Sequence, residues 1–193
     1  NNMFQTLFDP SGADSLDFST SSQPWSIDLE LSAPNTDAPY AIGLAEPMQG
    51  LPVPTSLYWL YGSFESVIGS AQSDQITGSG GNNSVRGGAG DDQIDGGGGI
   101  DTAIFSGTPG QYTFQRDAGF VTLSGIDGID TLYNVERLQI GAVKIAIDID
   151  GHGGQAYRLY QAAFNRSPDQ GGLGYQMNAL DIDHQSSVNG DGG

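Results

Sequence analysis

Four consecutive blocks of nine residues, running from Gly69 to Ile104, limit the fold of this chain more than any other feature. The blocks read GSAQSDQIT, GSGGNNSVR, GGAGDDQID and GGGGIDTAI. Every block begins with glycine, has Asp or Asn at its sixth position and has a small or aliphatic residue at its eighth. A repeat this short cannot bury its own apolar residue, so the pattern predicts a stack of similar units that bury it between them.

The repeats predict a coil in which a three-residue strand alternates with a glycine-rich turn. Two blocks make one coil of eighteen residues, so residue i is expected to lie over residue i+18. Asp74 would then lie over Asp92, and Asn83 would lie over Asp101. Glycine permits positive φ in the turns and lets backbone carbonyls approach an ion closely.

The composition favours a cation between the coils. The chain of 193 residues has 23 Asp+Glu, of which 19 are Asp, against 6 Lys+Arg, and its net charge is −17. One small apolar side chain per strand cannot offset the ordering entropy of so many glycines, and stacked carboxylates repel one another. Oxygen ligands without Cys or His point to Ca²⁺, because Mg²⁺ prefers a tighter octahedron and retains its water.

The same composition excludes several classes of protein. The acidic charge excludes binding of nucleic acid or an anionic membrane through a basic face. The chain has no Cys, which excludes disulfides and thiolate zinc sites, and no apolar run long enough to span a membrane. The sequence begins at Asn1 without a signal peptide, and we expect it to be part of a longer protein.

Two other interpretations of the repeats fit the residues less well. A flexible glycine-rich linker does not predict aliphatic residues in nine-residue register with Asp or Asn at a fixed offset. A phosphate-binding loop is the second alternative, but the segment 78–80, Gly-Ser-Gly, lacks the third glycine and the lysine of such loops.

The segments before the repeats predict strands and one long loop. Alternation and aromatic enrichment predict strands at 15–19, 25–31 and 56–61. Five prolines predict a long loop at 33–54. Residues 64–69 lead into the first repeat and are expected to form an irregular coil of the same stack.

The segments after the repeats predict a hairpin, further strands and helices. A hairpin is expected at 112–125, and residues 125–133 resemble a displaced repeat with Asp130 at its sixth position. Residues 135–150 predict two more strands. Apolar spacing predicts a helix at 154–165, and a Ser-Pro start predicts a second near 168–180.

The repeats and their lead-in, FESVIGSAQSDQITGSGGNNSVRGGAGDDQIDGGGG, resemble the RTX parallel β-roll of the C-terminal domain of serralysin-type secreted metalloproteases. Residues 9–19 are similar to the acidic segment D-x-G-G-x-D-T-x-D-F-S that precedes the roll in that family, with Ser11 and Ser15 replacing Gly and Thr. The resemblance covers residues 4–105. Residues 110–147 resemble the hairpin segment that follows RTX repeats, with its D-T-L-x-N-V-E-R-L core.

Residues 148–180 resemble part of a small helical domain of unassigned function that accompanies RTX repeats and surface-layer proteins. The resemblance implies a mainly β fold, an RTX parallel β-roll with irregular N-terminal coils, an antiparallel hairpin segment and two short C-terminal helices. It implies a β-roll at 1–107, a β-hairpin extension at 108–150 and a partial helical tail domain at 151–193.

The resemblance also implies a set of calcium ligands. The side-chain ligands are the sixth-position residues Asp74, Asn83, Asp92 and Asp101. The backbone carbonyls come from the first and third positions: Gly69, Ala71, Gly78, Gly80, Gly87, Ala89, Gly96 and Gly98. Asp14 and Asp17 are expected to form a further site. Asp130 has a weaker claim, because no neighbouring coil is evident for it.

We therefore expect a module that binds several Ca²⁺ ions and folds on binding them. The resemblance implies export by type I secretion machinery and folding outside the cell or at the bacterial cell surface. The alternative is a recognition module, a surface-layer or adhesin segment or a carbohydrate-binding accessory that contacts a polysaccharide or cell-surface ligand. Its aromatic residues would be Trp25, Tyr58, Trp59 and Tyr61.

Catalysis by this chain itself is not expected. The sequence has no H-E-x-x-H motif, and its two histidines, His152 and His184, lie 32 residues apart in Gly- or Asp-rich surroundings. The start of an EF-hand loop at Asp148-Ile-Asp150-Gly is a rival metal site, but Leu159 stands where that loop requires Glu. A turn is the better interpretation of this segment.

Overall fold

The structure is a computed structural model that describes residues 4–9, 11–30, 43–48 and 57–148. The chain divides into two compact units, Asn1–Ile145 and Ala146–Gly193. Nearly all described residues belong to the first unit. The two helices expected at 154–165 and 168–180 lie outside the described residues.

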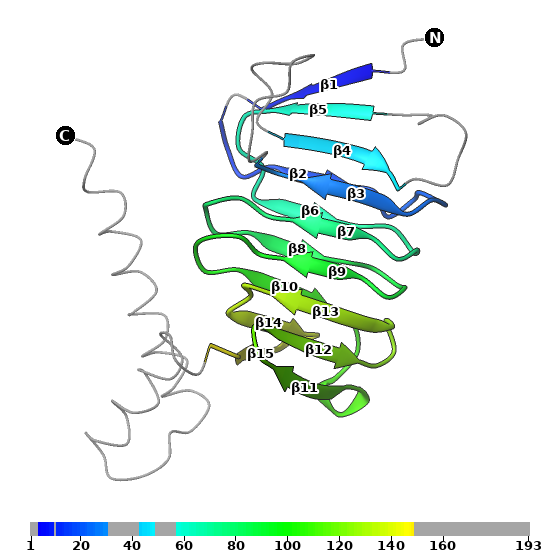
Figure 1. Ribbon diagram of the computed structural model, residues 1–193, viewed down its shortest axis with the longest axis vertical. Coiled ribbons are helices and arrows are strands. Elements are labelled where there is room, and N and C mark those ends of the chain that lie inside the picture. Colours follow the sequence, from blue (N-terminus) through cyan, green and yellow to red (C-terminus); the bar gives the residue numbers. More distant parts are fainter. Residues whose placement is uncertain (1–3, 10, 31–42, 49–56, 149–193) are drawn as a thin grey trace, which may run out of the picture. The chain divides into compact units, whose positions relative to one another are not determined.

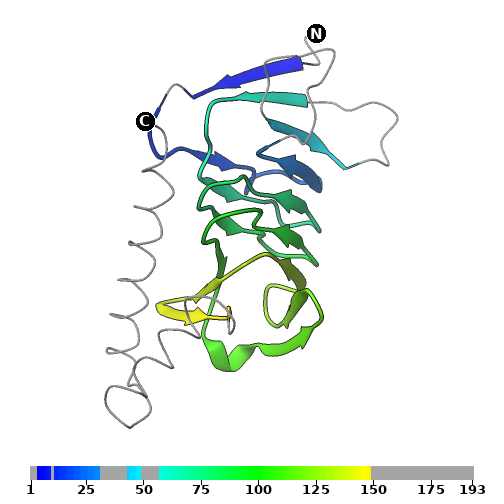
Figure 2. The same ribbon diagram turned by 60° about the vertical axis from the view of Figure 1, so that its left-hand side comes forward.

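The four repeats form a parallel coil. Their strands are β7 (Gln75–Thr77), β8 (Ser84–Arg86), β9 (Gln93–Asp95) and β10 (Thr102–Phe105). The strands alternate between a nine-stranded and a six-stranded sheet, so each turn crosses from one sheet to the other (Figures 1 and 2). Gln75 pairs with Gln93 and Ser84 with Thr102, which confirms the predicted eighteen-residue stacking.

The coil continues upstream of the repeats. In the six-stranded sheet, β2 (Ser15–Asp17) pairs in parallel with β6 (Ser66–Ile68), and β6 pairs with β8. In the nine-stranded sheet, β3 (Trp25–Asp28) pairs in parallel with β7. The predicted irregular coil at 64–69 is therefore part of the same stack.

One predicted loop contains a strand. Residues 33–54 were expected to be irregular because of their prolines, but β4 (Gly43–Pro47) lies between antiparallel β3 and antiparallel β5 (Leu57–Tyr61). The loop prediction is wrong here because Gly43, Ala45 and Pro47 alternate on the buried face, and the proline stands at the strand end, where the loss of its N–H is tolerated. Strand β1 (Phe4–Phe8) pairs in parallel with β5.

The coil also continues downstream. Strands β11 (Thr113–Asp117) and β12 (Phe120–Ser124) form the predicted hairpin, after a short 3₁₀ turn, η1 (Pro109–Gln111). Strand β13 (Ile129–Tyr133) is antiparallel to β12 but parallel to β9, and β14 (Arg137–Ile140) is parallel to β10. Strand β15 (Val143–Ala146) borders β14. Both sheets of the roll thus extend beyond the last repeat.

Two columns of apolar side chains fill the space between the sheets. The register stacks Ile27, Ile76, Ile94 and Leu132 in one sheet. It stacks Leu16, Val67, Val85, Ala103 and Leu138 in the other. All of them are buried, but each strand contributes a single side chain to its column, so the core is narrow. The described part of the chain contains no helix with the length and apolarity needed to cross a membrane.

Candidate metal centre

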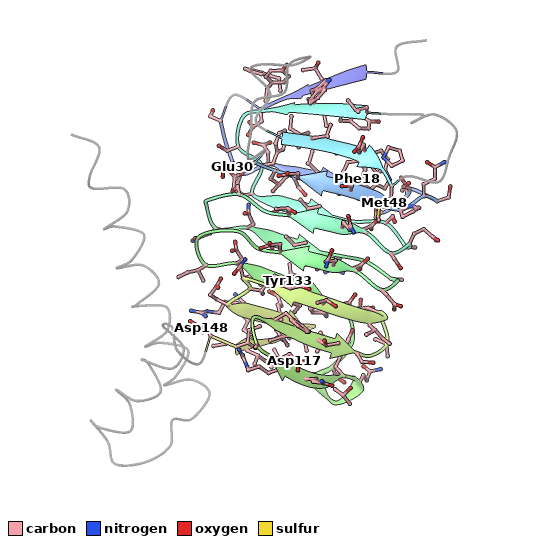
Figure 3. All side chains as sticks on the ribbon, viewed as in Figure 1. Phe18, Glu30, Met48, Asp117, Tyr133 and Asp148 are labelled. Carbon is pink, nitrogen blue, oxygen red and sulfur yellow. The ribbon has the colours of Figure 1, made fainter. Side chains whose placement is uncertain are left out.

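The turns of the roll form two columns, one along each edge where the chain crosses between the sheets. The first turn column contains residues 69–74 and 87–92, which lead into the nine-stranded sheet. The second turn column contains residues 78–83 and 96–101, which lead into the six-stranded sheet. Figure 3 shows Phe18 and Met48 at one end of β3 and Glu30 at the other.

Stacked carboxylates line the first turn column. The backbone N–H of Trp25 donates to Asp74 Oδ1 at 2.6 Å, and that of Asp74 donates to Asp92 Oδ1 at 2.8 Å. The N–H of Asp92 donates in turn to Asp130 Oδ1 at 3.0 Å. The three carboxylates are at most 3% exposed. The sequence shows no neighbouring coil for Asp130, but the structure provides one, because β13 pairs with β9.

The second turn column repeats this arrangement. The N–H of Asn83 donates to Asp101 Oδ1 at 2.7 Å, and the N–H of Asp101 donates to Glu136 Oε2 at 2.8 Å. Asn83 Oδ1 accepts from the N–H of Ser79 at 2.7 Å, while its Nδ2 donates to the carbonyl of Phe64 at 3.3 Å. The Asn83 amide oxygen is thus held in the turn as the Asp oxygens are.

The first-position carbonyls point into the same columns. The carbonyl oxygen of Gly87 packs against Cα of Gly69, and that of Gly96 packs against Cα of Gly78. A Cβ on Gly69 or Gly78 would overlap this carbonyl of the next turn and also the sixth-position side chain of its own turn. Both positions therefore require glycine because of the close approach. The third-position residues Ala71, Gly80, Ala89 and Gly98 lie on the exposed part of the turns.

Three buried carboxylate oxygens of the described residues have no hydrogen-bond partner: Asp9 Oδ2, Asp101 Oδ2 and Asp130 Oδ2. Asp101 Oδ2 and Asp130 Oδ2 receive no donor, although each residue is only 1% exposed. In the first two repeats the N–H of a serine supplies such a donor. The N–H of Ser70 donates to Asp74 Oδ2 at 2.5 Å, and the N–H of Ser79 donates to Asn83 Oδ1 at 2.7 Å. A buried anionic oxygen without a donor is costly unless a cation neutralises it.

Burial changes the acidity of these carboxyl groups. Burial first, and neighbouring carboxylates second, raise the pKa of Asp92 to about 7, that of Asp101 to about 8 and that of Asp130 to about 6. The pKa of Asp74 is also raised by burial. Asp92 and Asp101 therefore resist ionisation near neutral pH unless a cation stabilises the charged form.

The donor set fits calcium. Among the described residues, no three carboxylate or imidazole side chains gather around one point. A metal ion in either column would therefore take most of its ligands from backbone carbonyls, with carboxylates from two successive turns. Ca²⁺ accepts six to eight such oxygens in a flexible geometry, and it is the ion these residues suit.

The predicted pair Asp14 and Asp17 is not brought together. Asp14 lies in the turn before β2, where its N–H donates to Glu65 Oε2 at 2.9 Å, and a hydrogen bond with the Asp9 carboxyl raises its pKa. Asp9 is buried, and its Oδ2 receives no N–H or O–H donor. Asp17 lies at the other end of β2, is exposed and accepts from the N–H of Ser19 at 2.8 Å.

Sequence reasoning missed three acidic residues of these columns: Asp9, Glu65 and Glu136. In a repeat, the polar or acidic residue at the sixth position stands two residues before the buried aliphatic residue at the eighth. Glu65 stands two residues before Val67, and Glu136 stands two residues before Leu138. This spacing could have found both without the glycines.

The aromatic residues considered for sugar binding are largely internal. Trp25 and Trp59 are only 6% and 9% exposed, so neither presents a face to a ligand. Trp25 packs against Phe18 with ring centroids 4.3 Å apart and against Tyr58 at 5.9 Å. Tyr61 packs beside Trp59. His152, His184 and Asp150 lie outside the described residues.

Comparison with known proteins identifies the repeats. Residues 68–103 match the family model of the RTX calcium-binding nonapeptide repeat, described as four copies. RTX nonapeptide repeats bind calcium, so these residues form an RTX β-roll whose cofactor is Ca²⁺. A search of curated proteins finds no match.

Among solved structures, the chain is similar to the extracellular lipase LipA from Serratia marcescens, at 20% sequence identity and a TM-score of 0.23. The match covers 42% of this chain and 15% of the lipase chain, so the aligned part is a small fraction of that protein's length.

Proposed function

We propose that this chain is the calcium-folded part of a larger protein that leaves a bacterial cell through type I secretion machinery and folds outside it. In this role the module aids export and extracellular stability and performs no catalysis. The proposal rests on one observation: the roll buries a continuous series of stacked carboxylates whose oxygens point into the turn columns. Asp101 Oδ2 and Asp130 Oδ2 lack any hydrogen-bond donor.

The cation would be held by the groups that the turn columns present. These are the sixth-position side chains Asp74, Asn83, Asp92 and Asp101, with the first- and third-position carbonyls of the same turns. A bound Ca²⁺ supplies the positive charge that allows stacked carboxylates to remain ionised while buried. Since the narrow core contributes one side chain per strand, metal binding is folding free energy for this module.

This coupling accounts for export. Where calcium is scarce, repulsion between the carboxylates keeps the chain unfolded and able to pass through a secretion channel. Where calcium is abundant, each occupied site adds RT ln(1 + [L]/Kd), about 2.7 kcal/mol at a hundredfold excess over Kd. Several sites then convert an unstable chain into a stable roll.

Far-UV circular dichroism of the full chain during a Ca²⁺ titration tests the proposal, with Mg²⁺ and a chelator as controls. We expect a transition from coil to β structure with Ca²⁺ and none with Mg²⁺ at the same concentration. A chain equally folded in chelator would overturn calcium-driven folding, because the core alone would then be sufficient.

Export is tested separately, by secretion of the chain from cells that carry a type I transporter. Secretion of the wild-type chain only when the transporter is present supports the proposal. Transport that does not depend on the transporter contradicts the type I route and leaves calcium binding unaffected.

A further inference from the structure

The second turn column does not end with the last repeat. Strand β13 is followed by a short turn, residues 134–136, and then by β14. The N–H of Gly96 donates to the carbonyl of Tyr133 at 2.9 Å, which repeats the bond from Gly78 N–H to the carbonyl of Asp95 at 2.8 Å. Asn134 therefore occupies the first position of a further turn, directly after turn 96–101 in the column.

The carbonyl of Asn134 lies where the repeats place a ligand carbonyl. It packs against Cα of Gly96, as the carbonyl of Gly96 packs against Cα of Gly78. Asn134 has a φ of +48°, and its Nδ2 donates to Asp95 Oδ1 at 2.8 Å. Asn134 thus presents its backbone carbonyl to turn 96–101 as the first-position glycines do in the repeats, although Asn134 carries a side chain.

Glu136 takes the place of the sixth-position carboxylate. Its Oε2 accepts from Asp101 N–H at 2.8 Å, as Asp101 Oδ1 accepts from Asn83 N–H at 2.7 Å. Turn 134–136 has three residues where turn 96–101 has six. The additional methylene of Glu relative to Asp allows its carboxylate to reach the same position in the column from this shorter turn.

Asp101 provides the independent sign of a ligand. It is 1% exposed, and its Oδ2 has no hydrogen-bond partner. That oxygen lies beside Cα of Gly96, the same atom against which the Asn134 carbonyl packs. An anionic oxygen, a carbonyl and a second carboxylate therefore converge between turns 96–101 and 134–136. Arg137 follows Glu136, and its Nη1 donates to the Glu136 carbonyl at 2.9 Å.

We propose that these two turns hold a calcium ion outside the repeats, with the carboxylates of Asp101 and Glu136 and the carbonyls of Gly96 and Asn134 among its ligands. The inference rests on the calcium-binding function proposed above and extends it by one turn. The ion closes the second turn column at its C-terminal end. It also joins β14 to β10 through the residues that precede these strands.

The first test compares the calcium content of Glu136→Gln with that of the wild type and of a matched control, Glu46→Gln. Glutamine keeps an oxygen acceptor for the Asp101 N–H but removes the charge. Glu46 lies on β4, outside the turn columns, so its variant makes the same change in charge elsewhere. Bound calcium is counted by elemental analysis after gel filtration of the full chain, and affinities are measured by calorimetry.

We expect Glu136→Gln to bind one calcium ion fewer than the wild type and Glu46→Gln to bind the same number. Equal binding by Glu136→Gln would overturn the site. A wild-type chain that binds no calcium would overturn the proposed function as well. Loss of calcium from Asp92→Asn but not from Glu136→Gln would overturn this site alone.

A second measurement does not depend on the folding of any variant. Crystals of the wild-type chain grown in Ca²⁺ are examined for anomalous scattering from calcium. A peak within about 2.3–2.6 Å of the Glu136 carboxylate and the Asn134 carbonyl supports the site. Peaks confined to the turns of the repeats, 69–101, overturn it.

Discussion

The backbone N–H of Asp74 donates a hydrogen bond to the carboxylate of Asp92 at 2.8 Å, eighteen residues further along the chain. This bond joins two successive coils through the residue type that also binds the metal. Each carboxylate is thus placed by the backbone of the coil before it. If one coil is not folded, its backbone N–H cannot hold the carboxylate of the next turn in position. Folding and metal binding are therefore expected to occur together.

Substitution of Asp92 by Asn is expected to weaken calcium-dependent folding. Asparagine keeps an oxygen for the Asp74 N–H, but it removes the charge that lies between Asp74 and Asp130 in the column. The Ca²⁺ midpoint of the circular dichroism transition should rise about tenfold or more, which corresponds to about 1.4 kcal/mol or more.

The matched control is Asp117→Asn, which changes an exposed residue of β11. Its midpoint should equal that of the wild type. Equal shifts for the two variants would mean that overall charge, and not the turn column, determines calcium affinity.

The stability of the calcium-free fold should decrease as the pH rises. Burial raises the pKa of Asp92 to about 7 and that of Asp101 to about 8, from about 3.9 in an unfolded chain. The folded state therefore binds more protons than the unfolded state between these values. Any stability of the calcium-free fold is largest at low pH and is lost as the pH rises through about 7 to 8.

Far-UV circular dichroism in calcium-free buffer at pH 5 and pH 8 measures this effect. Any residual β signal of the calcium-free chain should be larger at pH 5, whereas calcium should bind more tightly at pH 8, because binding displaces protons. A calcium-free β signal that increases with pH would contradict the buried carboxylates of the structure.

Substitution of Gly88 by Ala should prevent the coil from closing. Gly88 has a φ of +119°, and a Cβ there would overlap the carbonyl oxygen of Ser70 in the turn above. Gly119, in the β11–β12 hairpin turn, has a φ of +94° but no atom within 4 Å of its would-be Cβ. Gly119→Ala therefore measures backbone strain without the overlap.

We expect Gly119→Ala to lower the free energy of unfolding by about 1–3 kcal/mol, the usual cost of a strained backbone conformation. Gly88→Ala should cost clearly more and reduce the calcium-bound β signal in circular dichroism. Similar losses for the two variants would show that close contact between turns is not required.

Substitution of Ile94 by Ala tests the narrow core. Ile94 is 1% exposed and lies between Ile76 and Leu132 in its column. The variant should lower the free energy of unfolding in saturating calcium by about 2–5 kcal/mol. Ile129→Ala is the control, because Ile129 is 54% exposed, and it should change stability by about 0.5 kcal/mol or less. A small loss for Ile94→Ala would mean that bound calcium alone maintains the roll.

The sequence predicts the repeats well because their partners lie at a constant separation. Asp74 and Asp92 are eighteen residues apart, and nine-residue periodicity makes that relationship visible. Asp101 and Glu136 are 35 residues apart, with a hairpin between them. Their stacking depends on the pairing of β14 with β10, which no local pattern determines. Strand β4 was missed for a related reason, since its pairing with β3 outweighs the turn preference of its prolines.

A last prediction separates Asp14 from Asp17, which the sequence motif treats alike. Asp14 lies at the N-terminal end of the second turn column, where its N–H donates to Glu65 Oε2 at 2.9 Å and the neighbouring Asp9 carboxyl raises its pKa. A cation between the neighbouring carboxyl groups of Asp9 and Asp14, with backbone carbonyls as its other ligands, would relieve their repulsion. Asp17 instead lies at the opposite end of β2, where hydrogen bonding to the Ser19 side chain first, and to the Ser19 N–H second, lowers its pKa.

Asp14→Asn should therefore remove one bound calcium ion and lower the calcium-saturated melting temperature, whereas Asp17→Asn should keep the full number of ions. Elemental analysis and thermal denaturation at fixed calcium measure both. The same loss of calcium from the two variants would place Asp17 in the site and contradict the separation along β2. Full binding by Asp14→Asn would show that Asp9 and Glu65 do not hold a cation with it, and the second turn column would then begin at turn 78–83.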